Sequence, residues 1–506
     1  MQKYKVSFES STEYSTFALH RLKMGNSLLK EKTAKGLFWG GLSSTLQQLL
    51  GLVIGIVLAR ILSPGDYGMV AMLMVFSLIA ACLQEGGFGA ALAIRKKVTA
   101  ADYNAVFWFS ILISGVMYLI LFFAAPLIAE FNKTPELTPL ARYAFLGFVI
   151  SSFGTAHFAY LFRNMMVKQR TIASFTGSIL SGIIGILLAL NGYAYWGLIT
   201  QDLCYKFITM SFFWYFSKWR PSFRVDLRPI REMFGFSSKM LLTNVLNNVN
   251  NQLLQSVLGH FYPVKLVGYY SQANKWNTMG YSMVGGMVNS IAQPVLAGVS
   301  EEKDRQRRVF RKMLRFTAFL SFPAMLGLAL IAPEFIVLAI KEKWVACVPY
   351  LQLLCIAGAF IPLSQLYSNL LVSRGKSTIY LISTAAMIVL QLIAVIVFHS
   401  SGIQSLLYAI VLFNIGWLFV WHRLASREIN LCLGDIIRDL FPFITVALLS
   451  VGVAYGFSML TDILWVRLLV KILVVLVTYP VLLYLLGAVV LRECLEFLFA
   501  KLKKKK

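Results

Sequence analysis

Apolar runs of about 20 residues recur along nearly the whole chain, separated by short polar or basic stretches. A run of this length crosses the hydrocarbon core of a bilayer as an α-helix. Mean hydropathy is +0.71, and 14% of the residues are charged, whereas soluble domains average ~25%. The alternating pattern of an outer-membrane barrel, with segments of ~10 residues, does not occur. The sequence therefore predicts an all-α polytopic membrane protein.

We identify fourteen such runs, and most of the connections between them are short, which makes neighbouring helices antiparallel. The predicted spans are 36–62, 69–93, 104–129, 138–162, 172–191, 194–216, 234–259, 267–298, 310–340, 345–371, 378–398, 403–422, 440–459 and 464–490.

The net charge of +25 is distributed unevenly between alternate connections. When the N-terminus is placed in the cytoplasm, most of the 47 Lys and Arg residues fall in cytoplasmic segments. The connections on the opposite side contain Lys133, Lys265, Lys341 and Lys343. This asymmetry follows the positive-inside rule and predicts that both termini are cytoplasmic. It also accounts for the basic residues as topology signals, so nucleic acid is not an expected partner.

A faint repeat relates the two halves of the chain at an offset of 200 residues. Three groups align: Leu46-Gln47-Gln48 with Leu246-Asn247-Asn248, Leu58-Ala59-Arg60 with Leu258-Gly259-His260, and Tyr67-Gly68 with Val267-Gly268, the last pair soon after Pro64 and Pro263. Both halves start on the cytoplasmic side, which indicates parallel repeats. Duplicated lobes are typical of transporters, with the substrate between the halves.

The predicted domains follow from the spans, the repeat and the charge runs. They are an N-terminal cytoplasmic extension with an amphipathic lead-in (1–35), an N-lobe of six helices (36–216), a basic cytoplasmic linker (217–233), a C-lobe of six helices (234–422), two further helices (423–490) and a basic cytoplasmic tail (491–506). No apolar core of a cleaved signal peptide occurs in the first 35 residues. The stretch that begins at Met24 resembles a natural start, so we expect Met24 to be an alternative to Met1.

Polar residues share one face in several predicted spans. In span 267–298 they follow steps of three or four and include Lys275, Thr278, Asn289 and Gln293. In span 234–259 one face contains Lys239, Asn247 and Asn250, and the adjoining face contains Asn251. In span 36–62 a thinner stripe contains Gln48. Small and amide residues also hold membrane helices together. A stripe as long as that of span 267–298 is more typical of the wall of a hydrated cavity.

Ionisable residues inside membrane spans are functional candidates. Glu85 and Asp202 are the acidic residues that lie well inside the predicted spans, and we take both as candidates for ion coupling. Asp202 precedes Lys206 by four residues, a spacing that equally favours a structural ion pair. Glu85 could bind a proton or pair with Lys239. The cations Arg60, Lys239 and Lys275 would suit an anionic cargo, although Lys239 could instead extend toward the membrane surface.

The sequence predicts neither a metal site nor an enzyme. The six Cys residues form no Cys-x-x-Cys pair and the five His residues are scattered, so no metal constellation is visible. The predicted outer connections are too short for the extramembrane acid and base groups that a membrane transferase would need.

Three stretches resemble the Wzx-type polysaccharide flippases, and in particular the branch that contains the colanic acid exporter. They are LARILSPGDYG (58–68), GGFGAALAIRKKVTAADYNAVFWFS (86–110) and VLGHFYPVKLVGYYSQA (257–273). The resemblance extends from about residue 30 to the C-terminus. It implies membership of the multidrug/oligosaccharidyl-lipid/polysaccharide exporter superfamily, whose lipid flippases have two six-helix lobes and two added C-terminal helices.

The resemblance implies a transporter that moves undecaprenyl-pyrophosphate-linked oligosaccharides across the bacterial inner membrane. Alternating access would be driven by an H⁺ or Na⁺ gradient, with no cofactor, and the expected partners include a polysaccharide polymerase and export machinery. Many members of this branch carry an acid just before Leu-Leu in span 234–259, where this chain has Asn251-Gln252. That difference favours Glu85 as a proton site and leaves Na⁺ coordination by amides open. A peptidoglycan-precursor flippase and a drug/cation antiporter are the alternatives.

Overall fold

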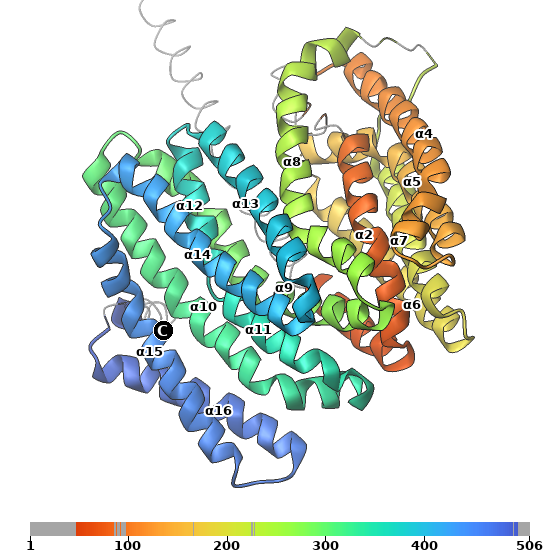
Figure 1. Cartoon of the computed structure of the whole chain (residues 1–506). Coiled ribbons are helices and arrows are strands. Elements are labelled where there is room, and N and C mark those ends of the chain that lie inside the picture. The colour runs from red at the N-terminus through yellow and green to blue at the C-terminus, as the bar shows by residue number, and fades with distance from the viewer. Residues whose placement is uncertain are drawn as a thin grey trace, which may run out of the picture. The chain divides into compact units, whose positions relative to one another are not determined.

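The computed structural model describes residues 47–85, 88, 92, 98–164, 166–223, 226, 228–488 and 490–493. Regular structure in these residues is entirely helical, as the apolar runs predict, and no strand occurs among them (Figure 1). The first described helix is Gln47–Ile61.

The remaining helices follow in chain order. They are α2 (Pro64–Glu85), α4 (Ala100–Phe131), α5 (Leu137–Arg163), α6 (Val167–Leu190), α7 (Ala194–Phe216), α8 (Arg228–Phe261), α9 (Val264–Gly298), α10 (Lys303–Ile340), η1 (Glu342–Cys347), α11 (Val348–Gly358), α12 (Ile361–Ser373), α13 (Ser377–Phe398), η2 (His399–Ser401), α14 (Ile403–Ile429), α15 (Leu433–Ser458) and α16 (Leu464–Leu485).

Ten segments of the described chain are helical, long and apolar enough to cross a membrane. They are α2, α4, α5, α6, α10, the α11–α12 segment, α13, α14, α15 and α16. This finding confirms a polytopic membrane protein. Several helices extend beyond the predicted apolar runs: α10 begins at Lys303 instead of residue 310, and α14 continues to Ile429 instead of ending at residue 422. Helical hydrogen bonding does not require apolar side chains, so these helices continue through polar flanking residues.

The predicted span 345–371 is not one continuous helix, and this corrects the prediction. α11 ends at Gly358 and α12 starts at Ile361, after a turn at Ala359 and Phe360. Pro362 lies in the first turn of α12 and has no backbone N–H to continue the hydrogen bonds of α11. The hydroxyl of Ser321 donates to the freed carbonyl of Ala359 at 2.8 Å. The apolar composition concealed this break because both pieces are apolar.

The chain divides into two compact units. Unit 1 contains residues up to Gly55, Ala80–Ala125 and Thr138–Leu242, and unit 2 contains Ile56–Ile79, Pro126–Leu137 and Thr243 onward. Within unit 1, α6 packs along α7, and a buried cluster is built around Phe88, Tyr103 and Met233. Within unit 2, α9 packs against α10, α11 and α12, while α15 and α16 pack against α10 (Figure 1).

Unit 2 contains a reciprocal contact between the first turns of α2 and α9. A Cβ atom on Gly68 would overlap the carbonyl oxygen of Val264, and a Cβ atom on Gly268 would overlap the carbonyl oxygen of Pro64. Gly68 and Gly268 are 200 residues apart, and so are Pro64 and Val264. The contact therefore joins equivalent positions of the predicted repeat.

Residues at positions 60 and 260 make a second crossed pair of contacts in unit 2. Arg60 Nε and a terminal guanidinium nitrogen each donate at 2.6 Å to the carbonyls of Ala339 and Leu338 in the last turn of α10. His260 Nδ1 lies 2.5 Å from the carbonyl of Phe131, the last residue of α4. Helix C-termini carry partial negative charge and attract such groups.

The contact at Arg60 is reinforced from the other side. Lys343, three residues beyond α10, donates to the carbonyls of Arg60 and Leu62 at 3.0 and 2.5 Å. The buried indole of Trp344 donates to the carbonyl of Ala59 at 2.8 Å. The helix Gln47–Ile61 and α10 therefore cap each other's C-terminal ends.

Gly68→Ala and Gly268→Ala should both lower the thermal stability of the purified protein, because each new methyl group would meet a backbone carbonyl that cannot move aside. Gly452→Ala is the matched control, since a Cβ atom there has open space around it and Ala is favoured over Gly inside a helix by roughly 0.5–1 kcal/mol. Unchanged unfolding temperatures for the first two variants would contradict the crossed contact.

Candidate functional site

An open cavity of about 670 Å³ lies within unit 2, lined by residues of α8, α9, α11, α12, α13 and α14. Its size is within the ~300–1,000 Å³ typical of small-molecule sites. The polar lining residues include Asn274, Asn277, Thr278, Tyr281, Ser282, Asn289, Ser364, Gln365, Ser368, Asn369, Thr384, Gln391 and Asn414. The aromatic ones include Tyr270, Phe360, Tyr380, Trp417 and Trp421. Among the described lining residues, none is Asp, Glu, Lys, Arg or His.

One wall of the cavity is a chain of amides between α9 and α12. Asn369 Nδ2 donates to Asn289 Oδ1 at 2.8 Å, and Asn289 Nδ2 donates to Gln365 Oε1 at 3.3 Å. Gln365 and Asn369 are four residues apart and therefore lie on one face of α12. Gly285, four residues before Asn289 on α9, leaves the space in which the Gln365 amide lies. These side chains hold one another in place and keep further donors and acceptors free for a ligand.

The opposite wall combines amides with aromatic rings from α13 and α14. Gln391 Nε2 donates to Asn414 Oδ1 at 3.1 Å, and Asn414 Nδ2 donates to the carbonyl of Ile410 at 2.9 Å. The rings of Tyr380 and Trp421 stack with centroids 5.8 Å apart. The buried indole N–H of Trp417 has no hydrogen-bond partner within the described chain. The indole ring of Trp417 lines the cavity, while its N–H is buried in the surrounding protein.

The break between α11 and α12 also reaches the cavity, because Ala357, Phe360 and Ile361 line it. Non-helical backbone at membrane depth is tolerated where it is buried in protein or lines a cavity. Discontinuous helices at a binding site are typical of secondary transporters. The site as a whole offers uncharged donors, acceptors and aromatic faces, which suits a neutral polyhydroxylated ligand.

Two of the predicted cavity residues, Thr278 and Asn289, line this cavity. Lys275 is partly buried on α9 but is not one of the lining residues, and Arg60 is bonded to the end of α10. Gln48 is partly buried and belongs to unit 1. Predictions for the side chains of Lys239, Asn247, Asn250, Asn251, Gln293 and Glu85 lie outside the described side chains.

Asp202 forms the ion pair that its spacing predicts, with its carboxylate 2.6 Å from Lys206 Nζ. This contact is the ion pair that the structural alternative for Asp202 predicts. It gives the carboxylate a local partner without involving a transported ion.

Sequence patterns did not identify the α12, α13 and α14 residues of the cavity. A weak signal was available in the i, i+4 pair Gln365 and Asn369, which interrupts an otherwise apolar span. Gln391 is the single amide of α13, Asn414 is one of two amides in α14, and the two residues are 23 apart in sequence. Their pairing follows from the packing of α13 against α14.

The fold of this chain is shared with a membrane protein of known structure. A solved structure of the lipid II flippase MurJ in an inward closed conformation superposes with a TM-score of 0.72 at 16% identity, covering 89% of this chain and 99% of that one. At this level of identity the likeness shows the fold alone.

The family model for "Polysaccharide biosynthesis protein" matches residues 57–349, and the chain belongs to this family. An uncharacterized membrane protein in the cps region of Klebsiella pneumoniae is 28% identical, with 69% of this chain and 72% of that protein covered. The lipopolysaccharide biosynthesis protein WzxC of Escherichia coli is 25% identical, with 69% and 71% covered. These findings confirm the predicted resemblance to the Wzx-type flippases. They identify a membrane transport protein rather than an enzyme.

Gly285→Ala should reduce transport, because a Cβ atom at this position would lie 2.5 Å from Gln365 Oε1. The Gln365 amide would have to turn away, which would break its hydrogen bond to Asn289. Surface polysaccharide in cells that carry the variant as their sole copy measures the effect. Gly286→Ala is the adjacent control, since its Cβ atom would have open space. Equal export by the two variants would show that the amide chain does not contribute.

Proposed function

We propose that this protein is a flippase that moves a lipid-linked oligosaccharide repeat unit across the bacterial inner membrane for surface polysaccharide assembly. The observation that supports this proposal most strongly is the neutral cavity of unit 2, lined with amides and aromatic rings. The chain belongs to a polysaccharide biosynthesis family, and sugars are ligands that such a cavity could bind.

The number of membrane-crossing helices is part of the proposal. Besides the ten apolar segments, α7, α8 and α9 have 23, 34 and 35 residues, and the helix Gln47–Ile61 is apolar. The amides of α8 and α9 reduce their overall apolarity, as polar cavity-lining faces would. Adding these four helices gives the fourteen spans that the apolar runs predict, with both termini cytoplasmic.

Different parts of the cargo would meet different chemistry. The sugar hydroxyls would bind the amides around Asn289 and Asn414, and the sugar rings would stack on aromatic faces such as Trp421. The pyrophosphate of an undecaprenyl-pyrophosphate cargo would be neutralised by cations, for which Lys239 and Lys275 remain the candidates. The prenyl chain would stay in the lipid.

An H⁺ or Na⁺ gradient would drive the cycle. The pairing of Asp202 with Lys206 favours Glu85 over Asp202 as the proton site. Amides near Asn251 remain the alternative for Na⁺. The mutual capping of the helix Gln47–Ile61 and α10 would close the outer side in one state and would have to separate in the other.

Two rival functions remain distinguishable. A drug/cation antiporter would be expected to expose acids to its ligand, and the described lining residues of the cavity include none. A flippase for the peptidoglycan precursor shares the fold. The repeat unit and the precursor differ in sugar composition, so the lipid-linked pool that accumulates identifies the cargo. A polysaccharide polymerase and export machinery are the partners that the proposal implies.

Deletion of the gene should abolish a surface polysaccharide and cause its lipid-linked repeat unit to accumulate on the cytoplasmic side. Extraction of undecaprenyl-linked glycans followed by mass spectrometry measures that pool, and expression of the wild-type chain should restore export. Unchanged surface glycan together with an unchanged lipid-linked pool would refute the proposal. Accumulation of the peptidoglycan precursor would favour the rival flippase.

Trp417→Phe should lower export because it removes the indole N–H and part of the ring surface of a side chain that lines the cavity. Trp465→Phe is the control, since the Trp465 side chain on α16 is exposed. Export is measured at equal protein levels in the membrane fraction. Full export by Trp417→Phe would exclude a contact between this N–H and the cargo.

A further inference from the structure

α10 contains two prolines, Pro323 and Pro333, in its membrane-spanning part. Proline lacks a backbone N–H, so each frees the carbonyl four residues earlier, at Phe319 and Ala329. Proline inside a helix also produces a bend. Little water is available in the hydrocarbon core, and an unbonded carbonyl there is costly. A donor from another helix can stabilise the bend at each of these two prolines, which we call the first and second proline joints.

The first joint is completed by α16. The hydroxyl of Tyr479 donates to the Phe319 carbonyl at 3.0 Å. Tyr479 is 4% exposed, and its ring lies against the Phe319 ring with centroids 5.9 Å apart. The hydroxyl thus supplies the donor that Pro323 removed.

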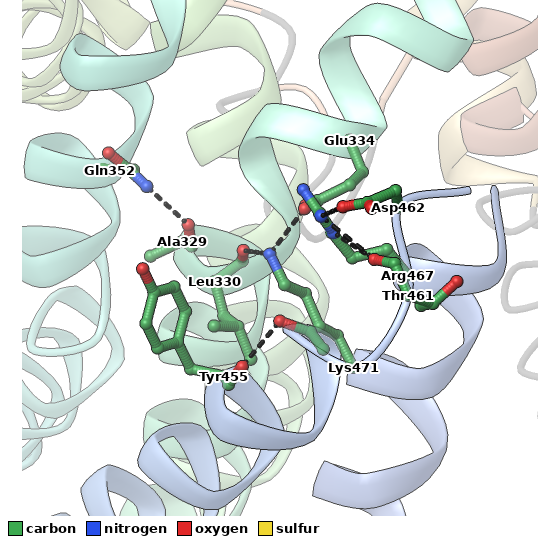
Figure 2. Close-up of polar contacts among 10 residues, drawn as sticks. Ala329, Leu330, Glu334, Gln352, Tyr455, Thr461, Asp462, Arg467 and Lys471 are labelled. Atoms are coloured by element: carbon green, nitrogen blue, oxygen red, sulfur yellow. Dashed lines mark hydrogen bonds and ion pairs between the residues drawn. The ribbon is translucent and has the colours of Figure 1, made fainter. Parts of the chain in front are cut away.

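The second joint is held from two sides (Figure 2). Gln352 Nε2 of α11 donates to the freed carbonyl of Ala329 at 3.2 Å. Lys471 Nζ of α16 donates to the next carbonyl, that of Leu330, at 3.1 Å. Gln352 belongs to the same helix as Leu354 and Ala357, which line the cavity. The joint therefore connects the wall of the cavity to α16.

A buried ion pair fixes the second joint. Lys471 Nζ lies 2.7 Å from Glu334 Oε1, and both side chains are 4% exposed. Glu334 directly follows Pro333, and the Tyr455 ring of α15 lies 6.0 Å from the Lys471 ammonium. Loss of one partner from such a pair leaves an uncompensated buried charge, which strongly destabilises the folded state. Lys471 and Tyr479 are eight residues apart, so both lie on the face of α16 that meets α10.

The hairpin of α15 and α16 is attached to α10 at a third place. Arg311, in the first third of α10, binds Asp439 of α15 through two contacts of 2.6 and 3.1 Å. Asp435 lies 3.3 Å from the same guanidinium. The hairpin is thus bonded to α10 before the first joint, at the first joint and at the second joint.

We infer that α10 is a helix with two proline joints and that the C-terminal hairpin α15–α16 controls its bending, which adjusts the cavity wall through Gln352 and α11. Tyr479, Lys471 and Gln352 act as positioning residues. The effect of bending on transport rests on the proposed function. The hydrogen bonds and the ion pair at the joints exist in the protein without cargo.

The first test uses Tyr479→Phe, which removes a single hydroxyl, with Tyr484→Phe on the exposed side of α16 as the control. We expect Tyr479→Phe to lower the unfolding temperature and export, and Tyr484→Phe to change neither. Pro323→Ala restores the N–H that bonds to the Phe319 carbonyl. The double variant Pro323→Ala/Tyr479→Phe should therefore regain stability but not export, because the joint is gone.

Two results of this test would overturn the inference. One is a Tyr479→Phe variant that matches Tyr484→Phe in stability and export. The other is full export by Pro323→Ala, which would show that transport does not use the joint.

The second test removes the buried ion pair. Glu334→Gln and Lys471→Met should each lower the unfolding temperature, and the double variant should recover most of the loss because no unpaired charge remains. If α10 bends at this joint, the double variant should still export less than the wild type. Full export by the double variant would overturn the role of the pair in transport.

The third test measures bending without cargo. Spin labels on cysteines at the exposed positions Arg308 and Lys341, in a background without the native cysteines, report the end-to-end distance of α10. In lipid nanodiscs we expect Pro323→Ala to give a longer and narrower distance distribution than the wild type. Identical distributions would refute bending at this joint. Because stability and label distances need no substrate, they decide the inference even if the proposed function fails.

Discussion

The hydrocarbon core of a membrane offers little water, so a backbone carbonyl that a proline frees is stabilised by a donor from the protein. This constraint explains much of the polar architecture of the described chain. The carbonyls at Phe319 and Ala329 are met by Tyr479 and Gln352. In α4, Pro126 frees the carbonyl of Phe122, and Arg142 of α5 donates to it at 3.3 Å while its guanidinium stacks 4.2 Å from the Phe122 ring. Polar residues inside these spans thus serve the backbone as well as any ligand.

The same need for partners governs the helix ends. Basic residues that set the topology also bind helix C-termini: Arg307 donates to the carbonyl of Asn430, and Arg374 donates to the carbonyls of Ser300 and Glu428. On the predicted outer side, Arg60 and Lys343 cap each other's helices. A basic residue that is counted as a topology signal therefore also forms structural hydrogen bonds. Its removal would affect both the folding of the protein and its orientation in the membrane.

Under the proposed function, the neutral groups of the unit 2 cavity would bind the sugars of a cargo that also contains charge. Its amides are held in pairs, as between Asn289 and Asn369, so that they remain oriented in a site surrounded by apolar helices. The cations predicted for the cargo are not among its described lining residues. Binding of sugars and neutralisation of a pyrophosphate would therefore take place at different positions. This separation would allow the cavity to distinguish sugars by hydrogen bonding rather than by charge.

The sequence by itself determined the helical membrane class, the approximate position of the spans, the repeat register that relates Gly68 to Gly268, and the pairing of Asp202 with Lys206. These properties depend on local apolarity and on spacing along one helix, which a single sequence contains. The tertiary structure alone decided the amide pairs such as Gln391 with Asn414, the break before Pro362 and the buried pair of Glu334 with Lys471. Each of these contacts depends on which helices pack together and on how each helix is rotated about its axis. The sequence does not distinguish a helix face that meets lipid from one that meets another helix, because both faces are apolar.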